Sequence, residues 1–195
     1  MTLRNITCAV TLCLLTLSGQ AVGKTEVPPY KNKSLSIEKR VDDLMGRMTL
    51  REKVLQLQNR GAGRLDEIDR IFNGESFGCT HEMGTTAAEC ATMYKELQQY
   101  MLTKTRLGIP IITSAEGIQG ILQNNCTLFP HALAQGSTFN PALIQRMTEA
   151  AGEEAKVIGI HQILSPVLDI ARELRWGRVE ETFGEDPYLI SEMGI

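Results

Sequence analysis

Two segments of the sequence bring together side chains that could recognise a polar ligand. The first is the short run Ser114–Gly120, which carries the carboxyl group of Glu116. The second runs from Asp169 to Pro187 and gathers arginine, glutamate and aspartate residues around Trp176. A fixed carboxylate can accept hydrogen bonds from two adjacent hydroxyl groups, and a guanidinium can donate a forked pair to hydroxyls or hold that carboxylate in place. These residue types therefore suit the binding of a sugar.

A surface network of ion pairs is an equally good interpretation of the second segment, because mixed charges along a loop commonly pair with one another. Other chemistries have weaker support. The sequence has no Ser-His-Asp order, no glycine-rich phosphate loop and no His or Cys spacing that would hold a metal. We interpret His81, His131 and His161 as structural residues. Sugar binding and a surface network both stay open, and no metal site is predicted.

Both segments follow short apolar runs that are typical of buried strands. These runs are Ile109–Thr113 and Ile160–Leu168, with helices predicted over Thr85–Thr105 and from Asn140-Pro141 onward. Helices that alternate with short apolar strands indicate parallel βαβ units and therefore an α/β fold class. Ligands in such folds bind at the carboxyl ends of the strands. The stretch of about 19 residues after the second strand is also longer than an ordinary connection, as functional loops often are.

Further elements are predicted before and around these strands. Helices are expected from Ser36 to Met48, from Thr49 to Leu57 and around Leu65–Phe72, and a short strand at Ser76–Thr80. Thr49 and Glu52 form a capping box at the start of the second helix. Apolar spacing also predicts the buried faces, which comprise Leu50, Val54 and Leu57; Cys90, Tyr94, Leu97 and Met101; Leu143, Met147, Ala151 and Ala155; and Tyr188, Leu189, Ile190 and Met193.

The first 23 residues have the layout of a secretory signal peptide. Arg4 provides a positive start, Ile6–Leu17 an apolar stretch, and Ser18–Gly23 a small-residue region for cleavage. The apolar stretch is shorter than the about 20 residues that span a bilayer, and an uncleaved anchor or a buried N-terminal helix is the alternative. We therefore expect residues 1–23 to be removed on export to the periplasm or the cell exterior, residues 24–35 to form a polar lead-in, and residues 36–195 to form one domain.

Composition excludes some classes of partner. The 20 Lys and Arg residues nearly balance 23 Asp and Glu residues and form no basic stripe, so neither nucleic acid nor a membrane is a predicted partner. Beyond the signal segment lie Cys79, Cys90 and Cys126, an odd number whose spacing does not select a disulfide pair. We interpret these three cysteines as small buried residues.

Several motifs, in order, resemble glycoside hydrolase family 3. Met48–Leu57 is similar to the opening helix of that family, and Leu107–Ile111 followed by Glu116–Gly120 resembles its second barrel strand and acidic loop. Leu128–His131 is similar to the Phe-Pro segment that comes next. The longest match is Ser165–Pro187, which contains the strings SPVLDIAR, RWGR and ETFGEDP. The resemblance covers about residues 36–195.

This resemblance implies a fold, a reaction and roles for particular residues. The fold implied is the N-terminal portion of a TIM (β/α)8-type barrel, and the activity is that of a retaining, exo-acting β-glycosidase. Glu116 and Arg178 are implied to bind the terminal sugar, with Asp169, Glu181 and Asp186 supporting the loop around them. The substrate implied is the nonreducing end of a β-linked gluco- or xylo-oligosaccharide, and no cofactor is implied. Gln119 stands where many members have His, so this loop departs from the family pattern.

The barrel is expected to be incomplete in this chain. Two or three βα units are visible, whereas a barrel has eight, and the helix that starts at Asp186-Pro187 reaches Ile195 without a cap. The family's Lys-His pair, aspartate nucleophile and general acid/base are implied to lie further along, and the sequence has no Lys-His, Ser-Asp-Trp or Ser-Asp-Tyr segment. We therefore expect no catalytic residue and no measurable hydrolysis from these residues alone. A non-catalytic sugar-binding relic and an unrelated α/β enzyme are the alternatives.

Overall fold

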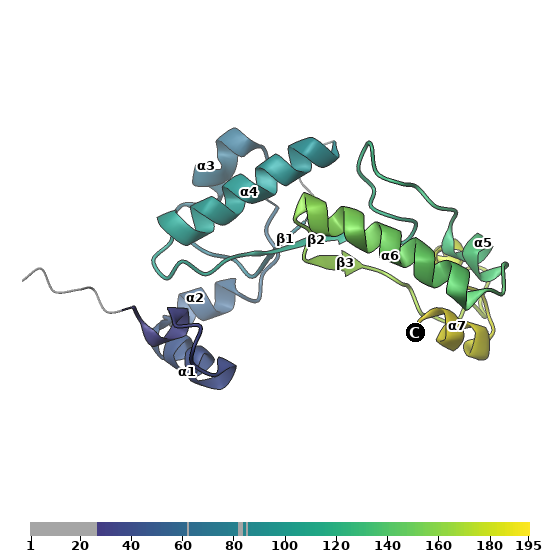
Figure 1. The fold of residues 1–195 in the computed structure, drawn as a ribbon, viewed down its shortest axis with the longest axis horizontal. Helices are drawn as coiled ribbons and strands as arrows, with labels where there is room; N and C mark the ends of the chain where they lie inside the picture. The colour runs from purple at the N-terminus through teal and green to yellow at the C-terminus, as the bar shows by residue number, and fades with distance from the viewer. Residues whose placement is uncertain (1–26, 62, 82–83, 85) are drawn as a thin grey trace, which may run out of the picture. The chain divides into compact units, whose positions relative to one another are not determined.

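The computed structural model describes residues 27–61, 63–81, 84 and 86–195 (Figure 1). The chain divides into two compact units, residues 1–44 and 45–195, which are described separately. The 3-10 helix η1 (Pro29–Lys31) lies in the first unit and leads to helix α1 (Ile37–Arg47), which begins in that unit and ends in the second, so the predicted first helix is confirmed. The Tyr30 N–H donates to Asp43 Oδ2 at 3.1 Å. The predicted signal peptide, residues 1–23, lies outside the described residues.

The second unit alternates helices with short strands. In chain order its elements are α2 (Leu50–Leu55), η2 (Leu65–Glu67), α3 (Ile68–Phe72), β1 (Cys79–Thr80), α4 (Ala87–Lys104), β2 (Ile112–Glu116), α5 (Ala132–Gly136), α6 (Pro141–Ile158), β3 (Gln162–Leu164), η3 (Val179–Glu181) and α7 (Pro187–Met193). The three strands form one parallel sheet in the order β1-β2-β3. The prediction of an α/β fold with parallel strands is therefore confirmed.

Strand β2 begins later than predicted, at Ile112 rather than Ile109. The side chain of Gln98 on α4 explains the difference, because its amide takes both backbone hydrogen bonds of Ile111. Gln98 Nε2 donates to the Ile111 carbonyl at 2.5 Å, and Gln98 Oε1 accepts from the Ile111 N–H at 3.2 Å. Pro110 has no N–H to give to a neighbouring strand. A helix side chain thus occupies the place of a strand partner at the start of β2.

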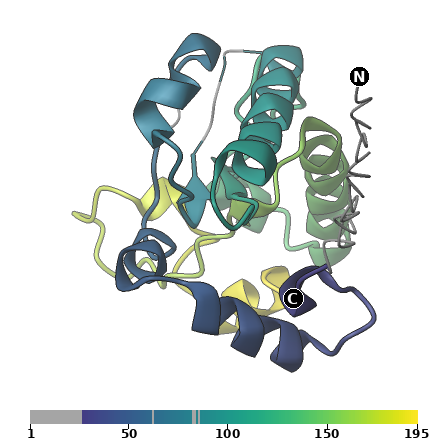
Figure 2. The same ribbon diagram turned by 90° about the vertical axis from the view of Figure 1, so that its left-hand side faces the viewer.

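Helix α4 buries the face that its sequence predicts. Its residues Cys90, Tyr94, Leu97 and Met101 are all at most 2% exposed. They pack in one cluster with residues of α6 and of the β2 region, namely Ala155, Ile158, Ile111 and Ala115. Helices α4 and α6 lie side by side (Figure 2). This cluster is the main core of the second unit.

A smaller core surrounds the amino-terminal half of α6. It contains one residue each from α5, α6 and the loop before α7, and two from α7: Ala132, Ile144, Phe183, Ile190 and Met193. Helix α7 forms where it was predicted, but the prediction for its buried side is wrong for Tyr188, which is 72% exposed. A helix of this length buries only the positions one turn apart that face its neighbours.

Helix α2 starts as predicted but buries a different residue. Thr49 Oγ1 accepts from the Glu52 N–H and Glu52 Oε2 accepts from the Thr49 N–H, at 3.2 and 2.8 Å, which confirms the capping box. Leu50 and Leu57 are 78% and 88% exposed, whereas Leu55 is buried, so the predicted face is wrong. The Gly78 N–H donates to the Leu55 carbonyl at 3.2 Å. The segment that leads into β1 therefore meets the end of α2 at Leu55. The Leu55 side chain packs into the main core.

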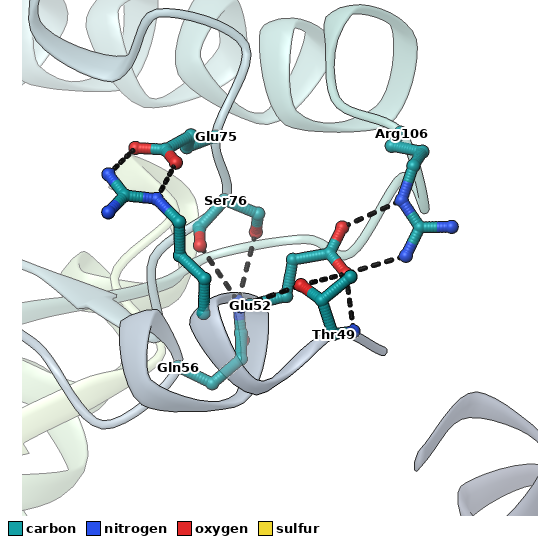
Figure 3. Close-up of polar contacts among 7 residues, drawn as sticks. Thr49, Glu52, Gln56, Glu75, Ser76 and Arg106 are labelled. Carbon is teal, nitrogen blue, oxygen red and sulfur yellow. Dashed lines mark hydrogen bonds and ion pairs between the residues drawn. The ribbon is translucent and has the colours of Figure 1, made fainter. Parts of the chain in front are cut away.

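Four charged residues at the amino ends of β1 and β2 form what we call the amino-edge network: Arg51, Glu52, Glu75 and Arg106 (Figure 3). Arg106 Nε and Nη2 donate to the two oxygens of Glu52 at 2.9 and 2.5 Å. Arg51 pairs in the same way with Glu75, at 2.5 and 3.0 Å. The hydrogen bonds from Arg106 lower the pKa of Glu52 to about 2. The network joins α2 to the two segments that lead into the sheet.

Candidate functional site

Glu116 is the last residue of β2 and is half-buried. It pairs in register with Leu164 of β3, so it stands at the carboxyl edge of the parallel sheet. The next residue, Gly117, packs closely against β3. A Cβ there would lie 2.1 Å from Ile163 Cγ2, so a larger residue would push the two strands apart. The sheet thus holds the Glu116 carboxyl group at the edge where ligands of α/β folds bind.

The loop after β3 folds back on itself. Val167 pairs with Thr182 in an isolated parallel bridge, and the Ala171 N–H donates to the Gly184 carbonyl at 3.0 Å. Thr182 is fully buried and its Oγ1 donates to the Val179 carbonyl at 2.8 Å. These bonds give the long charged segment a defined backbone path.

Phe183 anchors this loop on the smaller core. Its ring is 5% exposed, and its backbone runs directly against α5. A Cβ at Gly136 would lie 2.3 Å from the Phe183 carbonyl oxygen. Only glycine permits this approach of helix and loop. The position of the residues just before Phe183 is therefore set by α5.

Arg178 bonds to one carboxylate and feels the charge of two others, and we call these four residues the Arg178 cluster (Glu116, Asp169, Arg178 and Glu181). Its Nε and Nη2 donate to Glu181 Oε2 at 2.9 and 2.5 Å. Bonding to Glu181, followed by the charges of Asp169 and Glu116, raises the pKa of Arg178. In return, the hydrogen bonds and charge of Arg178, with a contribution from His131, lower the pKa of Glu181. Of the five residues singled out from the sequence, Arg178 and Glu181 are therefore in direct contact, and Asp169 and Glu116 act on Arg178 through their charge.

The fifth residue, Asp186, has a different position. It caps α7, where its Oδ1 accepts from the Tyr188 N–H at 2.9 Å. Glu173 and Arg175 form another separate pair, with Arg175 Nη2 2.7 Å from Glu173 Oε2 and both side chains exposed. Hydrogen bonds from Arg175 lower the pKa of Glu173 to about 2. The loop therefore contains the surface ion pairs of the second interpretation, at Arg175 and at the partly exposed Arg178, and sugar binding stays a prediction.

The Arg178 cluster offers donors and acceptors side by side. Glu181 takes up one edge of the guanidinium through Nε and Nη2, and a guanidinium has five N–H donors in all. Glu116 adds a carboxylate from the strand end, which can accept from vicinal hydroxyls. Beside Glu181 there is a small pocket of about 30 Å³, also lined by Gly117 and Ser165. That volume is close to the room that one water molecule needs.

Sequence reasoning missed the place of His81 at the same sheet edge. His81 follows β1, and its Nδ1 lies 3.0 Å from both Ser114 Oγ and Asn59 Nδ2. Ser114 and Glu116 share one face of β2 because side chains on a strand alternate. This alternation of side chains along the strand was the sequence signal that could have placed Ser114 on the same face as Glu116. Within the described ranges, no three His, Cys, Asp or Glu side chains group as a metal site.

A candidate membrane span was sought in the same part of the chain. None of the helices described there has both the length and the apolar character needed to cross a bilayer.

Comparison with known proteins identifies the family to which this sequence is similar. The family described as "Glycosyl hydrolase family 3 N terminal domain" matches residues 49–195. Beta-glucosidase C of Emericella nidulans is 33% identical over 186 residues, covering 86% of this chain and 30% of that protein. A beta-xylosidase of Formosa agariphila is 41% identical over 106 residues, 51% of this chain and 15% of that protein. Among solved structures, beta-glucosidase from Listeria innocua in complex with glucose is similar with a TM-score of 0.66 at 30% identity, covering 80% of this chain and 23% of that one.

The fold and site define an α/β protein with a charged cluster at the carboxyl edge of a small parallel sheet. The chain belongs to glycoside hydrolase family 3 and contains that family's N-terminal domain sequence. The resemblance stated from the motifs is therefore confirmed. The chain spans less than a third of the length of each curated relative described above.

Proposed function

We propose that this chain supplies part of the terminal-sugar site of a β-glucosidase or β-xylosidase. In this proposal Glu116 accepts hydrogen bonds from sugar hydroxyls and Arg178 donates to the same sugar. Asp169 and Glu181 hold Arg178, while Asp186 holds the end of the loop through the cap of α7. The names of the relatives, β-glucosidase and β-xylosidase, support this substrate class, and a similar structure was solved with glucose bound.

One observation carries the proposal. Glu116 ends β2, Arg178 belongs to the loop after β3, and the charge of Glu116 nevertheless contributes to the raised pKa of Arg178. In this proposal two segments distant in the sequence supply an acceptor and a donor to the same sugar. A purely structural ion pair needs only Arg178 and Glu181, so the proximity of Glu116 supports a ligand-binding role.

We further propose that β1, β2 and β3 are the first strands of a (β/α)8 barrel. Their parallel order, with helices α4 and α6 in the connections, is the repeating pattern of that fold. In such barrels the binding residues stand at the carboxyl ends of the strands, as Glu116 does. The three strands would then contribute one side of the site, and residues outside this sequence the rest.

The reaction proposed for the whole protein is retaining hydrolysis of the terminal β-linked sugar. Retention needs one carboxylate as nucleophile and a second carboxyl group as acid and base, about 5–5.5 Å apart. Neither role is given to a residue of this chain, because the Lys-His and Ser-Asp segments associated with them do not occur in the sequence. The 195-residue chain is accordingly proposed to bind part of the sugar and to be inactive alone.

Export completes the proposal. Residues 1–23 are proposed to be a cleaved signal peptide that directs the protein to the periplasm or the cell exterior. Two relatives are named as periplasmic enzymes, a β-glucosidase/β-xylosidase of Dickeya chrysanthemi and a β-glucosidase of Salmonella typhimurium, which supports this location.

The source locus provides the test. Sequencing beyond codon 195 is expected to reveal a frame that continues into a Lys-His segment and then a Ser-Asp segment. The complete product should hydrolyse p-nitrophenyl β-glucoside or β-xyloside, and NMR should detect the β-anomer as the first sugar released. The 195-residue chain should release no nitrophenol. An inverted first product, or a complete product that binds sugars without cleaving them, would contradict the proposal.

A further inference from the structure

Cys90 and Cys126 share one buried region of the second unit. Cys90 lies on α4 and is fully buried in the main core. Cys126 lies in the connection between β2 and α5, is half-buried, and packs against the same core. The third described cysteine, Cys79, lies on β1, where its Sγ is 3.3 Å from Ser114 Oγ in a polar environment. The sequence could not select a pair, but the packing separates Cys79 from the other two.

The backbone holds the segments of these two cysteines together. Thr86 pairs with Asn124 in an isolated parallel bridge, and the Ala87 N–H donates to the Asn124 carbonyl at 3.1 Å. Cys90 lies one helical turn after Thr86, with its N–H donating to the Thr86 carbonyl at 2.9 Å. Cys126 lies two residues after Asn124. Because the bridge is parallel, both cysteines lie beyond it in the same direction.

The connection around Cys126 is fixed by further bonds. The Cys126 N–H donates to the Gln123 carbonyl at 3.0 Å. The next residue, Thr127, donates to the Glu154 carboxylate from its N–H at 3.0 Å and from its hydroxyl at 2.7 Å. Burial raises the pKa of the Cys126 thiol, and the neighbouring groups of Glu154 and Cys90 raise it further. The hydrogen bonds thus fix the backbone on both sides of Cys126, and the effect of Cys90 on its pKa places the two thiols in the same region.

We propose that Cys90 and Cys126 form a disulfide bond when the chain meets a small disulfide oxidant such as oxidised glutathione. This inference is independent of the proposed glycosidase function. The bond would tie the segment that follows Glu116 to helix α4. It would hold the part of the β2–α5 connection that contains Cys126 against the main core.

The chemistry follows ordinary thiol–disulfide exchange. A pocket of about 290 Å³, lined by Cys126, Glu154 and Ala87 among others, is the route by which we propose that the oxidant reaches Cys126. The Cys126 thiolate attacks one glutathione sulfur and releases the first glutathione thiolate. The Cys90 thiolate then attacks Cys126 Sγ and releases the second. Two protein thiols lose two protons and two electrons, and one glutathione disulfide becomes two glutathione thiols.

The test is to treat the reduced full chain with oxidised glutathione and to identify the cross-linked peptides by mass spectrometry. Cleavage after glutamate places Cys79, Cys90 and Cys126 on three different peptides. We expect the Cys90–Cys126 peptide to exceed any pair with Cys79 by about tenfold. Its rate of formation should rise about tenfold for each pH unit below the raised pKa of Cys126, since the thiolate is the nucleophile.

Two variants and one condition provide the controls. Cys79→Ser should keep the Cys90–Cys126 bond, and Cys126→Ser should lose it without a replacement bond from Cys90 to Cys79. In concentrated urea the preference should disappear, because it depends on the fold. A chain that keeps its thiols under oxidised glutathione, or that gives the same mixture of pairs with and without urea, would overturn the inference.

Discussion

The amino-edge network and the Arg178 cluster are both built from arginine and acidic side chains, at opposite edges of one parallel sheet. They differ in the balance of positive and negative charge. In the amino-edge network two guanidinium groups meet two carboxylates, and each pair forms two hydrogen bonds. In the Arg178 cluster a single guanidinium bonds to Glu181 and also lies in the field of Asp169 and Glu116. The first group is balanced and the second has an excess of negative charge.

This difference allows the proposed roles of the two groups to be tested separately. Matched pairs satisfy one another, so the amino-edge network contributes to holding α2 against the strands, by a modest amount because its side chains reach solvent. In the Arg178 cluster the one guanidinium is bonded to Glu181 and also lies in the field of two further carboxylates, an arrangement that our proposal assigns to a neutral, hydroxyl-rich ligand. Changes in the Arg178 cluster are therefore expected to alter activity, and changes in the amino-edge network to alter stability.

The largest effect is expected from Arg178→Ala in the complete enzyme. Loss of charged donors to the terminal sugar should lower kcat/KM about 100-fold. Arg175→Ala is the matched control, because Arg175 pairs with Glu173 in the same loop, and its raised pKa has no contribution from Glu116 or Asp169. It should change kcat/KM less than about twofold. Equal effects of the two variants in steady-state kinetics would remove the distinction between the surface pair and the cluster.

A smaller effect on activity is expected from Glu181→Gln. The neutral amide leaves Arg178 in place but weakens the bonds that hold it, so kcat/KM should fall about tenfold. The adjacent Glu180→Gln, at an exposed position, should leave kcat/KM unchanged. Steady-state kinetics of both variants tests whether Glu181 holds Arg178 in place. An unchanged kcat/KM for Glu181→Gln would show that this ion pair does not contribute to activity.

On the opposite edge, Arg106→Ala should destabilise the chain without acting on the chemistry. It removes both bonds to Glu52 and the bond to the Arg47 carbonyl at 2.9 Å. A loss of about 1 kcal/mol is expected in urea unfolding, followed by the fluorescence of Trp176. Arg51→Ala, whose side chain is 72% exposed, should have less effect. An unchanged urea midpoint for Arg106→Ala would contradict the structural role of the network.

The smallest effect is a pH dependence from Glu52. Its pKa in the folded chain is about 2, below the ordinary value of 4.5, so its contribution to stability is complete above 4.5 and is lost as the pH falls towards 2. Because the pair is partly exposed to solvent, the loss is expected to be less than about 1 kcal/mol. The difference in urea midpoint between the native chain and Glu52→Gln should shrink across this range. A difference that stays constant would assign the acid sensitivity to other carboxylates.

Local rules predicted the elements better than their contacts. The capping box of Thr49 and Glu52, the buried face of α4 and the start of α7 at Asp186 each depend on a few neighbouring residues, and each was predictable. The buried residue of α2 was not, because the distant Gly78 segment decides it. The start of β2 was not, because the partner of Ile111 is a side chain on α4.

The candidate site follows the same division. The position of Glu116 at the end of one strand, and of Arg178 in the long loop that follows another, could be predicted from apolar runs and the family motifs. Their proximity could not, because it depends on the Val167–Thr182 bridge and on the contact of Phe183 with Gly136. Asp186 could not be separated from the cluster by sequence, since a capping carboxylate and a bracing carboxylate have the same residue type.

The clamp of Gln98 on Ile111 has a consequence for amide hydrogen exchange. The Ile111 N–H is bonded to a side chain of α4 and not to a strand, so its exchange reports how often that helix lifts from the sheet. The amide of His161, bonded to the Thr113 carbonyl at 2.9 Å, reports instead on separation of β2 from β3. The two protection factors would measure, in one experiment, whether helix and strands open as one unit or as two.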